Sequence, residues 1–113
     1  MATLSTHVLD TTLGRPAAGL ALSLQHRDAE GEWQPLSAGV TDADGRIPKT
    51  TLAPDGLAPG VYQLVFETGP YLLRVHGKSF YPYVPIVFEV VEDQHYHVPL
   101  LLSPFAFSTY RGS

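Results

Sequence analysis

Histidine is the residue type in this chain best suited to chemistry near neutral pH, and three of the five histidines lie in two strand-like segments. His7 lies in "LSTHVLD", and His95 and His97 lie in "HYHVPLLL". An imidazole with an ordinary pKa of about 6.5 can take a proton from water. Because side chains alternate along a strand, His95 and His97 share one face, opposite Tyr96 and Val98. The pattern predicts histidines on the outer face of the sheet.

Three uses of such outer-face histidines are open. They can be ordinary solvent-exposed side chains, or they can line a pocket that a second subunit completes. The His95-x-His97 pair with His7 as a third ligand could also form a three-histidine zinc site with an open position. A lone His-x-His pair is common by chance, so the spacing is only a weak indication of metal.

Two further features carry groups that could act on a substrate. Arg46 ends the turn "DADGR", where it is either a plain surface residue or a permanently charged fork that binds an oxygen. The last four residues offer hydroxyls at Tyr110 and Ser113, and Gly112 allows the backbone to come close to a ligand or a neighbouring chain. A chain end docked in a pocket could not be lengthened without filling it, so we expect this end to be used.

The elements that must hold these groups are mostly strands. Apolar residues alternate with polar ones in most segments, as in "GLALSLQHR", and turn-forming Gly, Pro and Asp separate the segments. The one exception predicts a short helix at about 69–77, with Thr68 as its N-cap and Gly77 as its stop. Seven or eight strands at this spacing are typical of an all-β, two-sheet β-sandwich. The clearest predicted strands are 20–27, 32–41, 61–67, 83–92, 95–102 and 105–112.

Composition excludes several classes of protein. The 113 residues suffice for one domain, and the absence of cysteine excludes disulfides and cysteine-ligated metals. The net charge of −4 comes with no basic run, so we expect no nucleic-acid partner. No window approaches the roughly 20 apolar residues that span a bilayer, and the first residues do not resemble a signal peptide. We therefore expect a cytoplasmic protein without a membrane partner.

The predicted outer faces carry more apolar area than a monomer needs. Pro99 and Leu101 share the face of His97, and Phe105 and Phe107 share one face of the last strand. Either a twisted core and a covering loop use both faces, or the chain associates through them.

Five segments together resemble the transthyretin-like 5-hydroxyisourate hydrolase family: "LSTHVLDTTLGRPA", "TDADGR", "FYPYVPIVFEV", "HYHVPLLLSP" and the terminal "YRGS". They span residues 4–113 in the family's order, and the terminal tetrapeptide separates the hydrolases from the hormone carrier. The resemblance implies one transthyretin-like domain over 1–113, with eight strands and one short helix. It also implies a homotetramer, a dimer of dimers, with active sites in a channel at the dimer–dimer interface.

The same resemblance implies an activity without a cofactor or a metal. Family members open the six-membered ring of 5-hydroxyisourate at an amide bond during urate degradation, giving 2-oxo-4-hydroxy-4-carboxy-5-ureidoimidazoline. Phe105 and Phe107 stand where tyrosine is frequent in the family, which we interpret as a packing variation. The matching motif positions are His7, Arg46, His97 and Ser113 for catalysis, with His7, Arg46 and Tyr110 for substrate binding and Arg111 and Gly112 for support at an interface.

Roles follow from the chemistry of these groups. His7 or His97 would take a proton from the attacking water, and the sequence does not decide which. Arg46 would stabilise the oxyanion, and Ser113 would orient a histidine or the water rather than act as a nucleophile. The chief alternative is a transthyretin-type carrier that binds a small aromatic ligand in the same channel. A third possibility is a sandwich domain that only mediates interactions.

Overall fold

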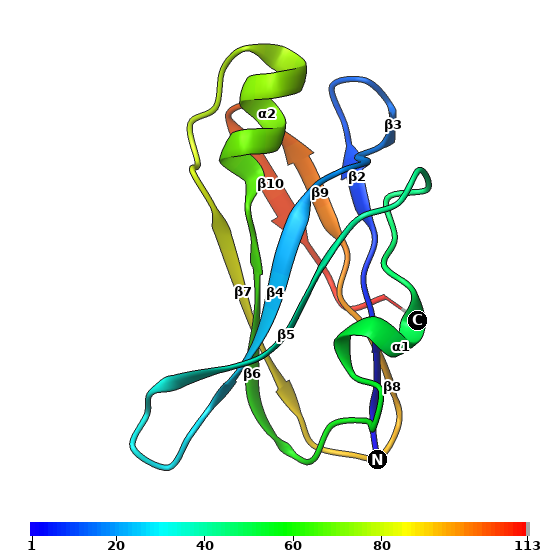
Figure 1. Ribbon diagram of the computed structural model, residues 1–113, viewed down its shortest axis with the longest axis vertical. Coiled ribbons are helices and arrows are strands. Elements are labelled where there is room, and N and C mark those ends of the chain that lie inside the picture. The colour runs from blue at the N-terminus through cyan, green and yellow to red at the C-terminus, as the bar shows by residue number, and fades with distance from the viewer. Residues whose placement is uncertain (113) are drawn as a thin grey trace.

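Two layers of strands face each other in the computed structural model, which describes residues 1–112 apart from the side chains of 49 and 50 (Figure 1). The first layer is a four-stranded antiparallel sheet in the order β5-β4-β6-β7. It is formed by β4 (Ala21–Arg27), β5 (Trp33–Val40), β6 (Gly60–Phe66) and β7 (Val84–Val90).

The second layer contains the candidate site. Its main sheet has the order β10-β9-β2-β3, and the parallel β2–β9 pair continues into a second parallel pair, β1–β8. Counting β1 with β2, and β8 with β9, as single interrupted strands gives eight strands among residues 1–112 and confirms the predicted sandwich. The members are β1 (Thr3–Ser5), β2 (Val8–Asp10), β3 (Arg15–Pro16), β8 (His95–His97), β9 (Leu100–Ser103) and β10 (Ala106–Thr109).

Two strand predictions need correction. The expected strand 95–102 breaks between β8 and β9 at Val98 and Pro99, because proline has no N–H to give to the ladder. The expected strand 105–112 ends at Thr109, and the residues after it leave the sheet. Both breaks lie beside the candidate site and free the backbone there for other contacts.

Period-two alternation correctly predicted the core. Leu22, Leu24, Leu64 and Phe66 all point inward and are buried, as are alternate residues of β7 and β9. The outer residues of β4 and β7 remain half-buried or exposed, as a sandwich of two half-solvated sheets requires, whereas Gln63 on the outer face of β6 is buried.

The predicted helix is present as α2 (Thr68–His76). It ends where Gly77 adopts a left-handed conformation with φ of 74°, and the Gly77 N–H donates to the carbonyl of Leu73. The predicted cap is wrong, because Glu67 occupies the N-cap position and Thr68 Oγ1 instead donates to the Tyr81 carbonyl at 2.8 Å. A second helix, the single turn α1 (Lys49–Leu52), was not predicted. Neither helix is long enough to cross a membrane.

A buried carboxylate fastens α2 to β2, the strand that follows His7. Asp10 is fully buried and accepts hydrogen bonds from Tyr71 Oη at 2.8 Å and from the backbone of Leu13, and it pairs with His76 Nε2 at 2.7 Å. Burial by itself would raise the pKa of Asp10, but these hydrogen bonds outweigh it and lower that pKa. The carboxylate is therefore ionised and ties the helix to the sheet.

Candidate active site

Backbone bridges bring distant segments of the chain together around His7 and His97. His7 pairs with Arg46 in an isolated antiparallel bridge, and His97 pairs in the same way with Gly112. The Gly112 N–H donates to the His97 carbonyl at 2.9 Å, and the Leu100 N–H donates to the His7 carbonyl at 2.9 Å. Three of the positions singled out in the sequence, and the terminal segment, are therefore held by main-chain contacts.

The "DADGR" turn is shaped to hold Arg46 beside His7. Asp42 Oδ1 accepts the N–H groups of Asp44 and Arg46 at 2.9 and 3.1 Å, which closes the turn. Gly45 has a φ of +73°, and a Cβ there would collide with the carbonyl oxygen of Val8. Only glycine allows this close approach, so the turn packs directly on the strand after His7.

His97 lies in an environment that disfavours a positive charge. The side chain is half-buried, and its Nδ1 is 2.7 Å from Ser5 Oγ. Burial lowers the pKa of His97, and the positive charge of Arg46 lowers it further, followed by smaller contributions from His7 and His95. At pH 7 the imidazole is neutral, which is the form that can take a proton from water.

The terminal segment packs on the His97 ring. A Cβ at Gly112 would clash with Cδ2 of His97 and lie 3.1 Å from Cγ, so any larger residue forces a shift. One residue earlier, the Arg111 guanidinium lies 4.5 Å from the centre of the Tyr96 ring. Gly112 and Arg111 therefore anchor the end of the described chain through contacts within one subunit. Ser113 lies outside the described residues.

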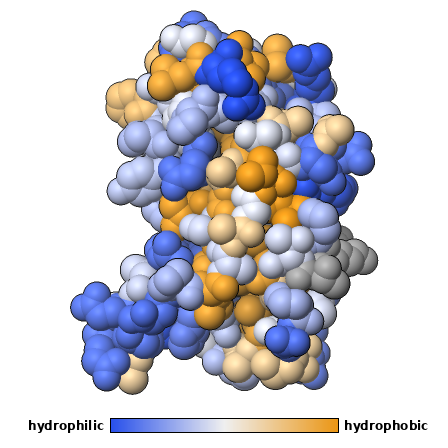
Figure 2. All heavy atoms as spheres, in the orientation of Figure 1, coloured by the Kyte–Doolittle hydropathy of each residue, from blue (hydrophilic) through white to orange (hydrophobic). Residues whose placement is uncertain are grey.

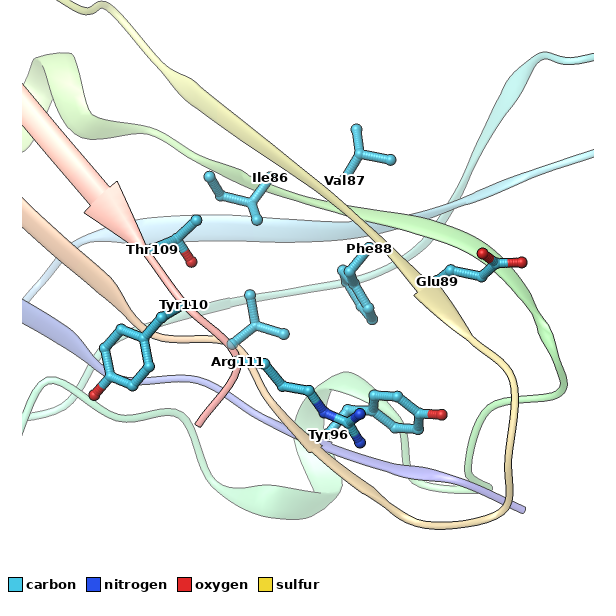
Figure 3. Close-up of a pocket in the computed structure, with 9 residues that line it drawn as sticks. Ile86, Val87, Phe88, Glu89, Tyr96, Thr109, Tyr110 and Arg111 are labelled. Carbon is cyan, nitrogen blue, oxygen red and sulfur yellow. The ribbon is translucent and has the colours of Figure 1, made fainter. Parts of the chain in front are cut away.

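Tyr110 lies at a surface of its own beside β7. Its side chain is 58% exposed, and its hydroxyl makes no hydrogen bond within residues 1–112. Together with Arg111 it lines a cleft of about 310 Å³ against β7, and Figure 3 shows the Arg111 side chain extending toward Tyr96 there. His7, Arg46 and His97 do not line this cleft. Among the described residues, Tyr110 therefore lines a different surface from the one that holds the histidines.

The histidine cluster is open on its outer side. Arg46 and His95 are exposed, and His7 is half-buried. Large hydrophobic side chains are also exposed elsewhere, and Figure 2 shows hydrophobic surface at the α2 end of the molecule and along the middle of one face. The examples include Leu36, Val40, Leu73, Phe80, Tyr83 and Phe105.

Two hydroxyl residues at the site were not identified from the sequence. Ser5 Oγ bonds to ring nitrogens of both His95 and His97, and Thr3 Oγ1 bonds to the other nitrogen of His95. The available signal was the alternation in "TLS", which places residues 3 and 5 on one face. No three-residue cluster suited to a metal occurs in residues 1–112, and both His95 nitrogens already bond to hydroxyls.

The fold and these residues define a transthyretin-like sandwich with histidine and arginine at its outer surface. The model of the HIUase/Transthyretin family matches residues 4–112, and the chain belongs to this family. It is 48% identical to a mouse 5-hydroxyisourate hydrolase over 112 residues, covering 97% of this chain and 94% of that protein. A 5-hydroxyisourate hydrolase of Salmonella typhimurium is 43% identical, with coverage of 97% and 80%.

Solved structures include both branches of the family. The Klebsiella pneumoniae 5-hydroxyisourate hydrolase is 43% identical and superimposes with a TM-score of 0.86 over the whole of both chains. Sea bream transthyretin, in complex with thyroxine, is 32% identical with a TM-score of 0.90, covering 97% of this chain and 94% of that chain. The fold alone therefore does not separate an enzyme from a carrier, and the site residues must do so.

Proposed function

We propose that this chain is a 5-hydroxyisourate hydrolase, which opens the six-membered ring of 5-hydroxyisourate to give 2-oxo-4-hydroxy-4-carboxy-5-ureidoimidazoline. The observation that carries the proposal is His97, an imidazole kept neutral by burial and by Arg46, in the segment that the terminal Gly112 contacts. The relatives named 5-hydroxyisourate hydrolase in mouse and Salmonella support the substrate.

Attack of water on the ring amide accounts for the residues present. His97 or His7 takes one proton as the water oxygen bonds to the carbonyl carbon. The Arg46 guanidinium binds the oxyanion that forms, because it stays cationic and offers two parallel donors. The carbon–nitrogen bond then breaks, the nitrogen receives the proton from the imidazole, and the new carboxylic acid ionises. No step requires a cofactor or a metal.

The end of the chain supplies the remaining groups in this proposal. Ser113 orients a histidine or the attacking water, and Tyr110 contributes to substrate binding. Because Tyr110 lines a cleft that His7 and His97 do not line, its role requires the substrate, or the next subunit, to bridge the two surfaces.

Assembly into a homotetramer, a dimer of dimers with the sites at the dimer–dimer interface, completes the proposal. The exposed Arg46 and the half-buried His7 leave the site open to a cover from a second subunit, and the apolar residues exposed elsewhere support association of copies in general. The edge strands β7 and β10 of the two sheets are available for pairing between copies. Light scattering after size exclusion would test the mass, and cell fractionation would test the expected cytoplasmic location.

The second candidate function is a carrier, favoured by the likeness to sea bream transthyretin in complex with thyroxine. A carrier does not need a permanent positive charge and two proton-accepting side chains in one place. This chain has Arg46, His7 and His97 in segments joined by backbone bridges. The two functions differ in turnover, which a binding module lacks.

An isotope experiment tests the hydrolase directly. Urate oxidase generates 5-hydroxyisourate from urate in ¹⁸O-water, and the protein is added after the oxidase has been removed. The proposal predicts faster decay of the intermediate and one new ¹⁸O atom in the product carboxylate. Decay at the uncatalysed rate, with an aromatic ligand bound at one or more sites per tetramer, would favour the carrier.

A further inference from the structure

A line of four side chains leads from His97 to the exposed edge of the site. Strands β1 and β8 pair in parallel, with Ser5 opposite His97 and Thr3 opposite His95. Hydrogen bonds then join His97 Nδ1 to Ser5 Oγ at 2.7 Å, Ser5 Oγ to His95 Nε2 at 2.8 Å, and His95 Nδ1 to Thr3 Oγ1 at 2.7 Å. Ser5 is half-buried and Thr3 is exposed.

Two arrangements of this line use the single proton of the Ser5 hydroxyl within it. Ser5 can donate to only one histidine, so the other histidine then donates its N–H to Ser5. In the first arrangement Ser5 donates to His97 Nδ1, and neutral His97 then carries its proton on Nε2. In the second arrangement His97 Nδ1–H donates to Ser5, Ser5 donates to His95 Nε2, and neutral His97 has an unprotonated Nε2.

We propose that Ser5 and His95 are positioning residues that hold His97 in the second arrangement, with Nε2 ready to accept a proton from the attacking water. This inference rests on the proposed function and adds to it the atom of His97 that acts. When Nε2 takes up the proton, the Nδ1–H bond to Ser5 and the Ser5 bond to His95 keep their directions. The line needs no reorganisation during proton transfer, as an organised general base requires.

The positively charged groups around His97 explain why a neutral hydroxyl is needed at its Nδ1. Arg46 and His7 face it from the neighbouring segments, and His95 faces it from its own strand. Arg46 has no acceptor atom, and each histidine loses its acceptor nitrogen when it is protonated, whereas the Ser5 hydroxyl keeps its acceptor lone pairs. Ser5 supplies a neutral acceptor at that nitrogen, and His95 fixes the direction of the Ser5 hydroxyl.

The test combines nitrogen NMR with kinetics. Long-range proton–nitrogen spectra of ¹⁵N-histidine-labelled protein at pH 7 distinguish the protonated from the unprotonated ring nitrogen of His97. We expect an unprotonated Nε2 in the native chain, a mixture of tautomers in Ser5→Ala, and recovery of the native spectrum in Ser5→Thr. We expect kcat/KM to fall roughly ten- to a hundredfold in Ser5→Ala, mainly through kcat, and to recover in Ser5→Thr.

Control variants keep the result interpretable. Ser23→Ala removes a half-buried hydroxyl from β4 in the other sheet and should leave spectrum and kinetics unchanged. His95→Gln also removes a member of this line and is the variant to use if Ser5→Ala fails to fold. It should likewise give a mixture of His97 tautomers. A native chain in which His97 carries its proton on Nε2 would overturn the inference. So would a His97 tautomer and a kcat that stay unchanged in both Ser5→Ala and His95→Gln. An inactive native chain would instead refute the proposed function.

Discussion

Replacing Gly112 by alanine should displace the His97 ring without unfolding the protein. A Cβ at this position would lie so close to Cδ2 of His97 that one of the two must move by roughly 1 Å to reach an ordinary carbon–carbon contact of about 3.5 Å. The Gly112 N–H is bonded to the His97 carbonyl, so the backbone resists moving away and the ring takes up part of the shift.

The size of the effect follows from that displacement. A misplacement of about 1 Å can cost roughly 10²-fold in rate, which corresponds to about 2.7 kcal/mol of lost transition-state stabilisation. Only the end of the chain and the half-buried His97 ring are disturbed, so the melting temperature should change little. The assay is the decay of enzymatically generated 5-hydroxyisourate, followed by absorbance, together with a thermal melt of the same sample.

Gly77→Ala is the matched control for this substitution. Gly77 ends α2 with φ of +74°, and a Cβ added there would meet no other atom within 4 Å, so alanine costs about 1 kcal/mol of stability through backbone strain alone. It should lower the melting temperature and leave kcat/KM unchanged. A fully active Gly112→Ala protein would refute the reasoning that packing of the chain end on His97 sets the site.

Three further predictions concern charge and anchoring. Asp10→Asn should cost about 3 kcal/mol in urea unfolding, because Asp10 is fully buried and an amide cannot accept hydrogen bonds from Tyr71, Leu13 and His76 as the carboxylate does. The same change at Asp28, in the hairpin between β4 and β5, should cost clearly less. Because the pKa of His97 is lowered from 6.5, kcat/KM should decrease only at a pH below 6.5, where the imidazole becomes protonated. Arg46→Met removes a nearby positive charge and should raise the pKa of His97 in an NMR titration; an unchanged or lower pKa would contradict this. Arg111→Met keeps the stem but removes the cation over the Tyr96 ring, so activity should fall several-fold, and Arg111→Lys should retain more of it.

The sequence predicted those features that depend on local alternation. Inward leucines in β4 and the outer face of His95 and His97 both follow from a period of two, and the structure confirms them. The association of Arg46 with the histidines came from a family resemblance, since nothing local in "DADGR" indicates which strand the turn packs on. The structure supplies the reason in Gly45, which fits against the Val8 carbonyl.

The missed features depend on register between distant segments. Asp10 meets His76 across 66 positions of sequence, and Ser5 meets His97 across 92. Neither pairing has a local signal, because each requires knowing which strands are neighbours and which residues stand opposite. The wrong cap at Thr68 has a similar cause, since its hydroxyl found a tertiary partner in the Tyr81 carbonyl.

The central claim is that this chain turns over 5-hydroxyisourate through the site around His97, and one comparison tests it most directly. The absorbance decay would be followed with the native chain, with His97→Asn, and with His26→Asn, which removes a half-buried histidine packed against Tyr62 in the other sheet. The account predicts rapid decay with the native chain and with His26→Asn, and loss of at least roughly 10²-fold with His97→Asn. A native chain that leaves the decay unchanged, or a fully active His97→Asn protein, would contradict it.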